Sequence, residues 1–327
     1  MSTSRLPYVF RTGVLLAALV ALPADSFADN WPQQTVRILT GPLAAGSSID
    51  ATARVLAEEL SKRWKQSVVV DTRPGADGII AAKALLEARD GHTLLFTTHS
   101  IFTVVPLLRQ PIPYDPKGDF TPISLGVDDF LAIVAAPSLP ANSLPELVEL
   151  AKKKPTELNY YAVPGSPYLG YLAFQKGAGI NTTFVPYANH TNAISDLAEG
   201  RLHIAVLPLA AVVGLGKAGK VKLLAVLNDQ RSPAVADVPT VAESGFPGFF
   251  SGGLLGMFGP KDMPVELRER IASEMRDVLS RPDIKERLAS FGLVAHGTTP
   301  SEFAAILETQ RAKWAAIARE HDIKPQR

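Results

Sequence analysis

The sequence predicts an α/β protein built as two lobes with a cleft between them. Short runs of β-branched residues alternate with segments of helical period, and this alternation occurs in two halves of similar size. We find no low-complexity tract and no short-period repeat. Alternating strands and helices favour a mostly parallel sheet covered by helices. Ligands of such sheets bind beyond the carboxyl ends of the strands, so we look for function in the loops there.

Residues 1–28 are predicted to be a secretory signal peptide. Arg5 and Arg11 give it a positive start, residues 13–22 form an apolar run, and small residues precede a cleavage site after Ala28. The alternative is an uncleaved membrane anchor. The apolar run is too short for that, because a span needs roughly 20 residues. We therefore expect an exported, soluble protein.

Charge and composition exclude several classes of protein. The 327 residues include 33 Lys and Arg, 32 Asp and Glu and no Cys, and 46% are hydrophobic. Removing residues 1–28 takes away Arg5, Arg11 and Asp25, which leaves 31 groups of each sign. A neutral chain is not a general binder of nucleic acid, which needs a basic surface. Without Cys there are no disulfides, thiolate nucleophiles or Cys-based metal sites.

The first half contains three expected strands. A β-branched run ends at Gly41-Pro42, and a helix follows whose apolar residues recur at helical spacing from Ile49 to Trp64. A turn rich in Gly and Pro separates the second strand from the second helix. The expected elements are strand 35–40, helix 48–64, strand 68–70, turn 73–78, helix 79–88 and strand 93–98.

The second half repeats the pattern. Ser143 is a predicted helix cap, with Pro145 and Glu146 in the first turn. The expected elements are strand 131–135, helix 144–153, strands 158–162, 183–185, 203–207 and 223–226, and closing helices 265–279 and 301–319.

Two loops between a strand and a helix are the best candidates for function. Residues 41–50 and 163–169 are rich in small and hydroxyl residues, and a helix N-terminus offers N–H groups that bind anions. The first loop is a near miss for a nucleotide-binding P-loop, since Ser47 replaces the essential lysine. Ser47 is also a predicted N-cap, with Asp50 as its capping-box partner.

We find no catalytic constellation and expect no cofactor or metal. The histidines have no metal-ligand spacing, and the HExxH and GxSxG motifs are absent. His99 and His190, in predicted loops after strands, are the better candidates for ligand contacts. Asp128 and Asp129 fit either a paired-carboxylate site or, as we favour, a solvated turn between the lobes.

The chain resembles the Bug family of periplasmic solute-binding proteins, the receptors of tripartite tricarboxylate transporters. The resemblance runs along the mature chain through short motifs in a specific order and spacing. They are Trp31-Pro32, the end of the first loop at residues 46–50, and residues 73–78, 114–116 with 119–124, 137–140, 158–160, 185–187, 216–220, 231–233 and 237–245.

The resemblance implies a type II periplasmic-binding-protein fold that closes on its ligand like a flytrap. Lobe 1 would comprise residues 30–127 and 251–327, and lobe 2 residues 128–250. The family's ligands are small organic carboxylates, held by the two loops and delivered to membrane permease subunits. We expect a periplasmic monomer that is not an enzyme and binds no nucleic acid. Residues 41–53 and 162–175 contain no Lys or Arg, so helix dipoles would have to balance the anion.

The expected ligand contacts come from both loops and from later strand ends. They are Leu43, Ala44, Ala45, Gly46, Ser47, Ser48, Asp50, His99, Ser100, Pro164, Gly165, Ser166, Tyr168, Tyr187, His190 and Pro208.

Several of these residues depart from the family pattern. The first loop has less Gly, the second contains Pro164 and Tyr168, and Pro208 stands where the family commonly has an acidic residue. A bulkier, more apolar cleft suggests a carboxylate with an aromatic or hydrophobic frame, such as an aromatic dicarboxylate with one acid group at each loop. Tyr168 or Phe102 would stack on that frame.

Two other classes of protein remain open on the sequence. The same fold serves ligand-sensing periplasmic partners of two-component systems, which only genetic context or co-purification would separate from a transport receptor. A secreted hydrolase is less favoured, because it needs a nucleophile and a base within reach of each other.

Overall fold

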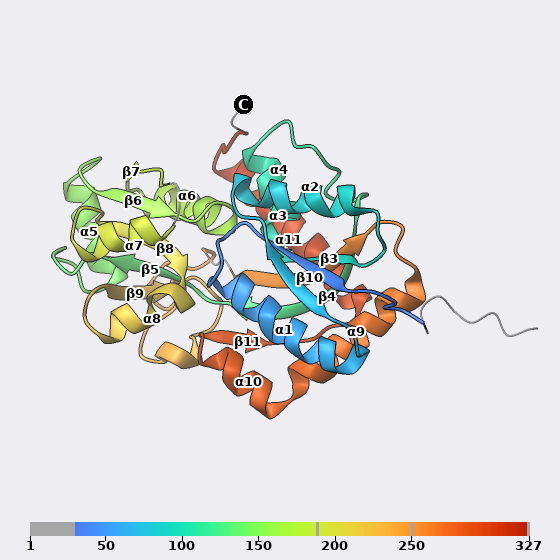
Figure 1. Ribbon diagram of the computed structural model, residues 1–327. Helices are drawn as coiled ribbons and strands as arrows, with labels where there is room; N and C mark the ends of the chain where they lie inside the picture. The colour runs from blue at the N-terminus through green and yellow to red at the C-terminus, as the bar shows by residue number, and fades with distance from the viewer. Residues whose placement is uncertain (1–29, 188–189, 250–251, 326–327) are drawn as a thin grey trace, which may run out of the picture.

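The strands divide between two mixed sheets, each covered by its own helices (Figure 1). The computed structural model describes residues 30–187, 190–249 and 252–325. The expected signal peptide, residues 1–28, lies outside the described residues. In the described part of the chain, no helix has both the length and the apolar character to cross a membrane.

Lobe 1 is built on the six-stranded sheet. Its strand order is β11-β4-β10-β3-β1-β2, with β1 parallel to β2 and β3, and β10 antiparallel to β3 and β4. The strands are β1 (Val36–Gly41), β2 (Val68–Thr72), β3 (Thr93–Thr98), β4 (Phe120–Asp129), β10 (Gly253–Pro260) and β11 (Leu293–Ala295).

Helices cover both faces of this sheet because its strands alternate their side chains. Ile38 joins a core with α1, α9 and α10, whereas the adjacent Leu39 joins a second core with α2, α3 and α11. The helices are α1 (Ser48–Trp64), α2 (Ile79–Ala88), α3 (Ser100–Thr103), α4 (Val105–Leu108), α9 (Val265–Ser280), α10 (Pro282–Ala289) and α11 (Pro300–Glu320), and η1 (Ala76–Gly78) is a 3-10 turn.

Lobe 2 is built on the five-stranded sheet, in the order β7-β6-β8-β5-β9. One continuous core joins this sheet to its helices. The strands are β5 (Leu131–Ala135), β6 (Asn159–Ala162), β7 (Thr183–Phe184), β8 (Ile204–Pro208) and β9 (Lys222–Val226). The helices are α5 (Leu144–Lys153), α6 (Ser166–Ala178), α7 (His190–Ala198) and α8 (Leu209–Lys217), with a 3-10 turn η2 (Pro233–Val235).

The predicted fold class is confirmed, and α1, α2, β3, β5 and α5 have the predicted limits. The Ser143 cap also forms, since its hydroxyl accepts from the Glu146 N–H. The expectation of mostly parallel sheets is wrong, because β10 and β5 each run antiparallel to both neighbours. The periodicity did not reveal β10, whose sequence contains three glycines and a proline.

Two chain segments join the lobes at the middle of the molecule. Only Phe130 separates β4 of lobe 1 from β5 of lobe 2. The Leu131 N–H donates to Asn228 Oδ1 at 3.0 Å, and the Leu227 N–H donates to the Leu131 carbonyl at 2.8 Å, so the first connection is hydrogen-bonded to the second. β4 pairs within lobe 1 as far as Asp129. The predicted lobe limits otherwise stay predictions, and residues 250–251 lie outside the described residues.

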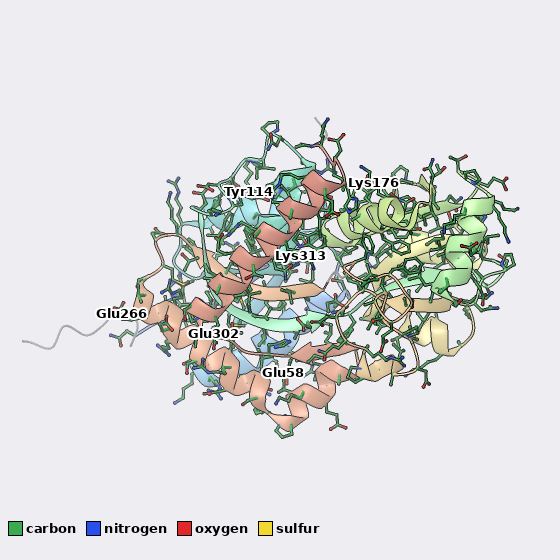
Figure 2. All side chains as sticks on the ribbon, turned by 180° about the vertical axis from the view of Figure 1, so that it is seen from behind. Glu58, Tyr114, Lys176, Glu266, Glu302 and Lys313 are labelled. Carbon is green, nitrogen blue, oxygen red and sulfur yellow. The ribbon has the colours of Figure 1, made fainter. Side chains whose placement is uncertain are left out.

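The lobes also touch behind the cleft. Figure 2 shows α11 crossing lobe 1 with Lys313 on it, and Lys176 beyond it on α6 of lobe 2. Trp314 of α11, Leu169 of α6 and Val104 form a small buried apolar cluster. This cluster lets α11 support both lobes.

Gly256 on β10 offers a test of this packing. A Cβ there would collide with the Phe303 ring and lie 2.9 Å from the Ser124 carbonyl oxygen. We expect Gly256→Ala to destabilise the protein by about 1–3 kcal/mol in urea unfolding, as overpacking does. Gly214→Ala on α8 is the control, because its Cβ would meet nothing within 4 Å. It should be neutral or stabilising, and equal effects of the two variants would contradict the packing described.

Candidate functional site

The two predicted loops meet across the cleft between the lobes. Loop 1 (residues 41–50) joins β1 to α1, and loop 2 (residues 163–169) joins β6 to α6. Ser100, just after β3 in lobe 1, donates from Oγ to Ser166 Oγ at 3.0 Å, and the Ser166 N–H donates to Ser100 Oγ at 3.2 Å. Direct hydrogen bonds therefore hold the lobes together at this point.

A small cavity lies between these loops. Its volume is about 30 Å³, which is room for roughly two water molecules. A carboxylic acid of several carbons therefore enters only if the lobes move apart. The lining residues are Pro42, Leu43, Ile49, Thr98, Ser100, Asp129, Leu131, Val163, Pro164, Ser166, Pro167, Pro208, Gly253 and Leu255.

Asp50 fixes the shape of loop 1. Its carboxylate is buried and accepts the Gly46 N–H at 2.9 Å and the Thr72 hydroxyl at 2.8 Å, and it forms a bidentate pair with Arg54. Burial alone would raise the pKa of Asp50, but the hydrogen bonds from Arg54, Gly46 and Thr72 outweigh it and hold the pKa below its usual value. Asp50 thus orders the loop and does not line the cavity.

The capping box predicted at α1 forms only by half. The Ser47 hydroxyl accepts the Asp50 N–H at 3.4 Å, whereas the Asp50 carboxylate bonds Gly46 instead of returning to Ser47. The first N–H groups of a helix have no partner within it, so the N-terminus of α1 can face an anion. At α6 the Ser166 N–H donates to Ser100 Oγ, Pro167 has no N–H, and the Tyr168 N–H donates to the Val163 carbonyl at 3.2 Å, so an anion reaches this helix end only when the contact between Ser100 and Ser166 opens. Ser48 and Ser166 begin these helices, and both are buried at the cleft.

Gly165 allows loop 2 to approach Ser100 of lobe 1. It precedes α6 with φ of +99°, a conformation that favours glycine. A Cβ on it would lie 3.0 Å from the Ser100 Cβ and 3.3 Å from the Ser100 hydroxyl oxygen. Its missing side chain is therefore what brings Ser166 within hydrogen-bonding distance of Ser100.

The cavity contains one carboxyl group and, among the residues that line it, no Lys or Arg. Asp129 ends β4 and is 3% exposed, and Ser48 Oγ donates to its Oδ2 at 2.5 Å. Burial raises the pKa of Asp129 to about 7; the Ser48 hydrogen bond opposes this rise and the neighbouring Asp128 adds to it. The favoured interpretation of these two residues as a solvated turn is wrong, because both belong to a strand and are largely covered.

The two histidines predicted at strand ends lie in different surroundings. His99 is fully buried; its Nδ1 pairs with the Thr103 hydroxyl at 2.8 Å and its Nε2 with the Gly252 carbonyl at 3.4 Å. Burial lowers its pKa to about 4, so it is neutral. His190 begins α7 half-buried, with its pKa lowered by burial. Neither lines the cavity.

Other predicted contacts also lie away from the cavity. Ala44, Ala45 and Gly46 are exposed and do not line the cavity. Tyr168 packs edge-on against Phe184 with ring centres 5.1 Å apart. The Tyr187 hydroxyl donates to Asp196 at 2.7 Å. Burial, followed by this hydrogen bond, raises the pKa of Tyr187 to about 12.

The suggestion that Phe102 stacks on a ligand is wrong. It is buried in lobe 1 against Phe258, with ring centres 4.4 Å apart. Of the predicted residues, Leu43, Ser100, Pro164, Ser166 and Pro208 line the cavity, and Ser48 and Gly165 contact residues that do.

Sequence reasoning missed the residues contributed by strand ends. Thr98 ends β3, Asp129 ends β4 and Leu255 lies near the start of β10, and all three line the cavity. Thr98 could have been found by asking which residue closes the predicted strand 93–98. Asp129 and Leu255 required knowledge of β4 and β10, neither of which was predicted.

A larger hollow of about 750 Å³ lies elsewhere on lobe 1, between the C-terminal end of α2 and the segment joining β10 to α9. Its lining includes Arg89, Asp90, Lys261 and Asp262. It lies at the N-terminal end of β3, whereas the two loops follow the carboxyl ends of their strands. We assign the site to the interlobe cavity, where the two helix N-termini converge. Within the described ranges, no three His, Asp or Glu side chains are grouped closely enough to hold a metal ion.

Comparison with known proteins agrees with this geometry. The model of the family described as tripartite tricarboxylate transporter family receptor matches residues 52–323. The chain belongs to this receptor family. The family consists of periplasmic solute-binding receptors rather than enzymes.

Relatives and solved structures extend over nearly the whole chain. A UPF0065 protein of Bordetella bronchiseptica is 31% identical and covers 96% of this chain and 94% of its own, and BugT of Bordetella pertussis is 30% identical over 95% and 96%. The structure of Rpa4515 of R. palustris with adipate has a TM-score of 0.85 at 30% identity, covering 90% of this chain and all of the other. MatC of Rhodopseudomonas palustris, with bound malate, has a TM-score of 0.80 at 26% identity, over 88% and 99%.

Gly165 gives a test of how the receptor closes. We expect Gly165→Ala to hold the lobes apart, because its Cβ would press on Ser100 and its φ is unfavourable for alanine. Small-angle scattering should then give a larger radius of gyration than for the unchanged protein. Gly179→Ala is the control, since Gly179 also has a positive φ but a Cβ there would meet nothing within 4 Å. A radius unchanged by Gly165→Ala would contradict this account.

Asp50 gives a test of how loop 1 is held. Because folding lowers its pKa, ionised Asp50 stabilises the fold at neutral pH. That contribution is lost as the pH falls from the usual pKa of aspartate, about 4, through the lower pKa in the folded protein. Asp50→Asn should cost about 1–3 kcal/mol of unfolding free energy at pH 7 and much less at pH 3. Asp71→Asn, which removes an exposed pair with Arg73, should change little, and a loss from Asp50→Asn that is the same at both pH values would refute the role of the charge.

Proposed function

We propose that this receptor binds a small organic carboxylate between loop 1 and loop 2 and delivers it to the permease of a tripartite tricarboxylate transporter. The observation that carries the proposal is the convergence of two helix N-termini, those of α1 and α6, on one interlobe cavity without a lining Lys or Arg. Helix N–H groups and hydroxyls would balance the anion's charge. The related structures with adipate and malate support a carboxylate ligand.

The lining favours a ligand with a hydrophobic frame. Leu43, Ile49, Leu131, Val163 and Leu255 give the cavity mostly aliphatic walls. Such walls lower the cost of excluding water around the body of the ligand. An aromatic or long aliphatic dicarboxylate would place one acid group at each loop, with aliphatic side chains and prolines rather than aromatic rings against its frame.

The remaining parts of the proposal concern the protein in the cell. We propose that residues 1–28 direct export to the periplasm and are cleaved after Ala28. The mature protein acts as a monomer. Lobe 1 comprises residues 30–127 and 251–327 and lobe 2 residues 128–250, except that Asp128 and Asp129, the last residues of β4, belong to the sheet of lobe 1. Ligand binding shifts the population toward closed lobes, and the permease recognises both lobes of that state.

Isothermal titration calorimetry tests this function. Terephthalate, phthalate, benzoate, citrate, adipate and glutamate form the ligand set. We expect at least one acid with a hydrophobic frame to bind more tightly than citrate. Tight binding of citrate alone would refute the hydrophobic frame, and no binding by any carboxylate would refute the function.

Serine variants test the place of binding. Ser47→Ala and Ser166→Ala should each weaken the affinity for the best of these acids by about 1–3 kcal/mol, the range for hydrogen bonds to charged groups. Ser143→Ala is the matched control, since Ser143 caps α5 in the same way as Ser47 caps α1 but belongs to neither loop 1 nor loop 2. Unchanged affinity in both test variants would remove these side chains from the site.

A further inference from the structure

Asp129 has an unused hydrogen-bonding atom inside the binding cavity. Its Oδ2 accepts from the Ser48 hydroxyl, while its Oδ1 is buried and has no partner among the described residues. The side chain is 3% exposed and belongs to the cavity lining. A buried carboxyl oxygen without a hydrogen bond is costly, so such an atom indicates that something else satisfies it.

The surrounding charged groups have other partners. Asp128, the neighbour on β4, pairs through Oδ2 with His296 of the segment after β11 at 2.9 Å, and this hydrogen bond raises the pKa of His296. Its Oδ1 is also buried without a partner among the described residues, but Asp128 does not line the cavity. His99 is neutral and bonded to Thr103 and Gly252, as described above. On α1, Asp50 pairs with Arg54. On α11, burial lowers the pKa of Lys313 to about 7, and Asp229 opposes that shift.

We propose that Asp129 selects the ligand, its free Oδ1 accepting a hydrogen bond from a hydroxyl or ammonium group that the bound carboxylate carries. This inference rests on the proposed function and narrows its substrate class to hydroxy- and amino-carboxylates. The ligand's acid group lies at the helix N-termini, and its donor group faces the end of β4. Asp129 is the one acidic side chain among the residues that line the cavity.

Discrimination follows from what closure does to each type of ligand. A ligand with a donor satisfies Oδ1 when the lobes close. A ligand without one brings a second anion beside Asp129 and leaves the oxygen unpaired unless the carboxyl group takes up a proton. Because the pKa of Asp129 is about 7, that proton is available below pH 7 and is withheld above it. The preference for a donor-bearing ligand should therefore grow with pH.

Matched pairs of acids that differ only in the donor test the inference. The probes are L-malate against succinate, L-glutamate against glutarate, and mandelate against phenylacetate, titrated calorimetrically into the mature protein at pH 5.5, 7 and 8.5. In whichever pair binds, we expect the donor-bearing acid to bind at least tenfold more tightly than its donor-free partner at pH 8.5. The affinity for the donor-free acid should fall by up to tenfold per pH unit above pH 7. The ratio of the two affinities should be smaller at pH 5.5.

Variants at β4 separate Asp129 from general effects. Asp129→Leu removes the acceptor at similar volume and should bring the affinities of the pair within about twofold at every pH. Asp129→Asn removes the charge and should abolish the pH dependence of the affinity for the donor-free acid. This variant provides the test if the leucine variant folds poorly. Asp71→Asn is the control, because Asp71 pairs with Arg73, does not line the cavity and does not contribute to the pKa shift of Asp129.

The outcomes distinguish this inference from the proposed function. The role of Asp129 is overturned if the donor-free acid binds equally or more tightly at pH 8.5. It is also overturned if Asp129→Leu and Asp129→Asn leave the ratio of the two affinities unchanged. In both cases carboxylate binding stands. A failure of all six acids to bind while terephthalate or adipate binds also overturns the role of Asp129 and leaves the proposed function standing. A failure of these six acids and of every acid in the first ligand set overturns both.

Discussion

The single residue Phe130 between β4 and β5 is the constraint on which the rest of the structure depends. Because the chain passes from one sheet to the other in one step, the carboxyl end of β4 and the start of β5 both lie at the cleft. Phe130 is buried in the core of lobe 2, and its carbonyl accepts the Leu209 N–H at 2.6 Å. Leu131 donates to Asn228 and accepts from Leu227 of the second connection, so hydrogen bonds join the two connections. The lobes are consequently linked at a narrow, ordered place about which closure can occur.

The cleft formed in this way is small and has no Lys or Arg among its lining residues. Loop 1 and loop 2 each end in a helix N-terminus, and the hydrogen bonds between Ser100 and Ser166 hold loop 2 against lobe 1. A binding site that depends on dipoles and hydroxyls works best where water is excluded, because their effect is strong only at low dielectric constant. The small size of the cavity and its aliphatic walls meet this condition. The glycine at position 165 is what makes so close an approach possible.

The same burial gives Asp129 its importance. In a wide, wet cleft this side chain would be a solvated carboxylate of little consequence. Buried beside Asp128, and with Ser48 as its one side-chain hydrogen-bond partner among the described residues, it becomes a group whose charge and hydrogen bonding any ligand must accommodate. Asp50 shows the opposite case. It is equally covered, yet Arg54, Gly46 and Thr72 satisfy it, and it acts on the shape of loop 1.

The sequence by itself determined the elements whose signals are local. Helical spacing and caps defined α1 and α5, β-branched runs defined β1 and β3, and the motifs along the chain indicated the receptor family. Loop 1 and loop 2 were likewise found from small and hydroxyl residues that precede a helix. Only the tertiary structure decided which of their residues face the cavity. Ala44 is exposed, His99 lies in the core and Asp129 lies in the cleft, because burial depends on strands such as β10 that lie far away in sequence and carry no local signal of their own.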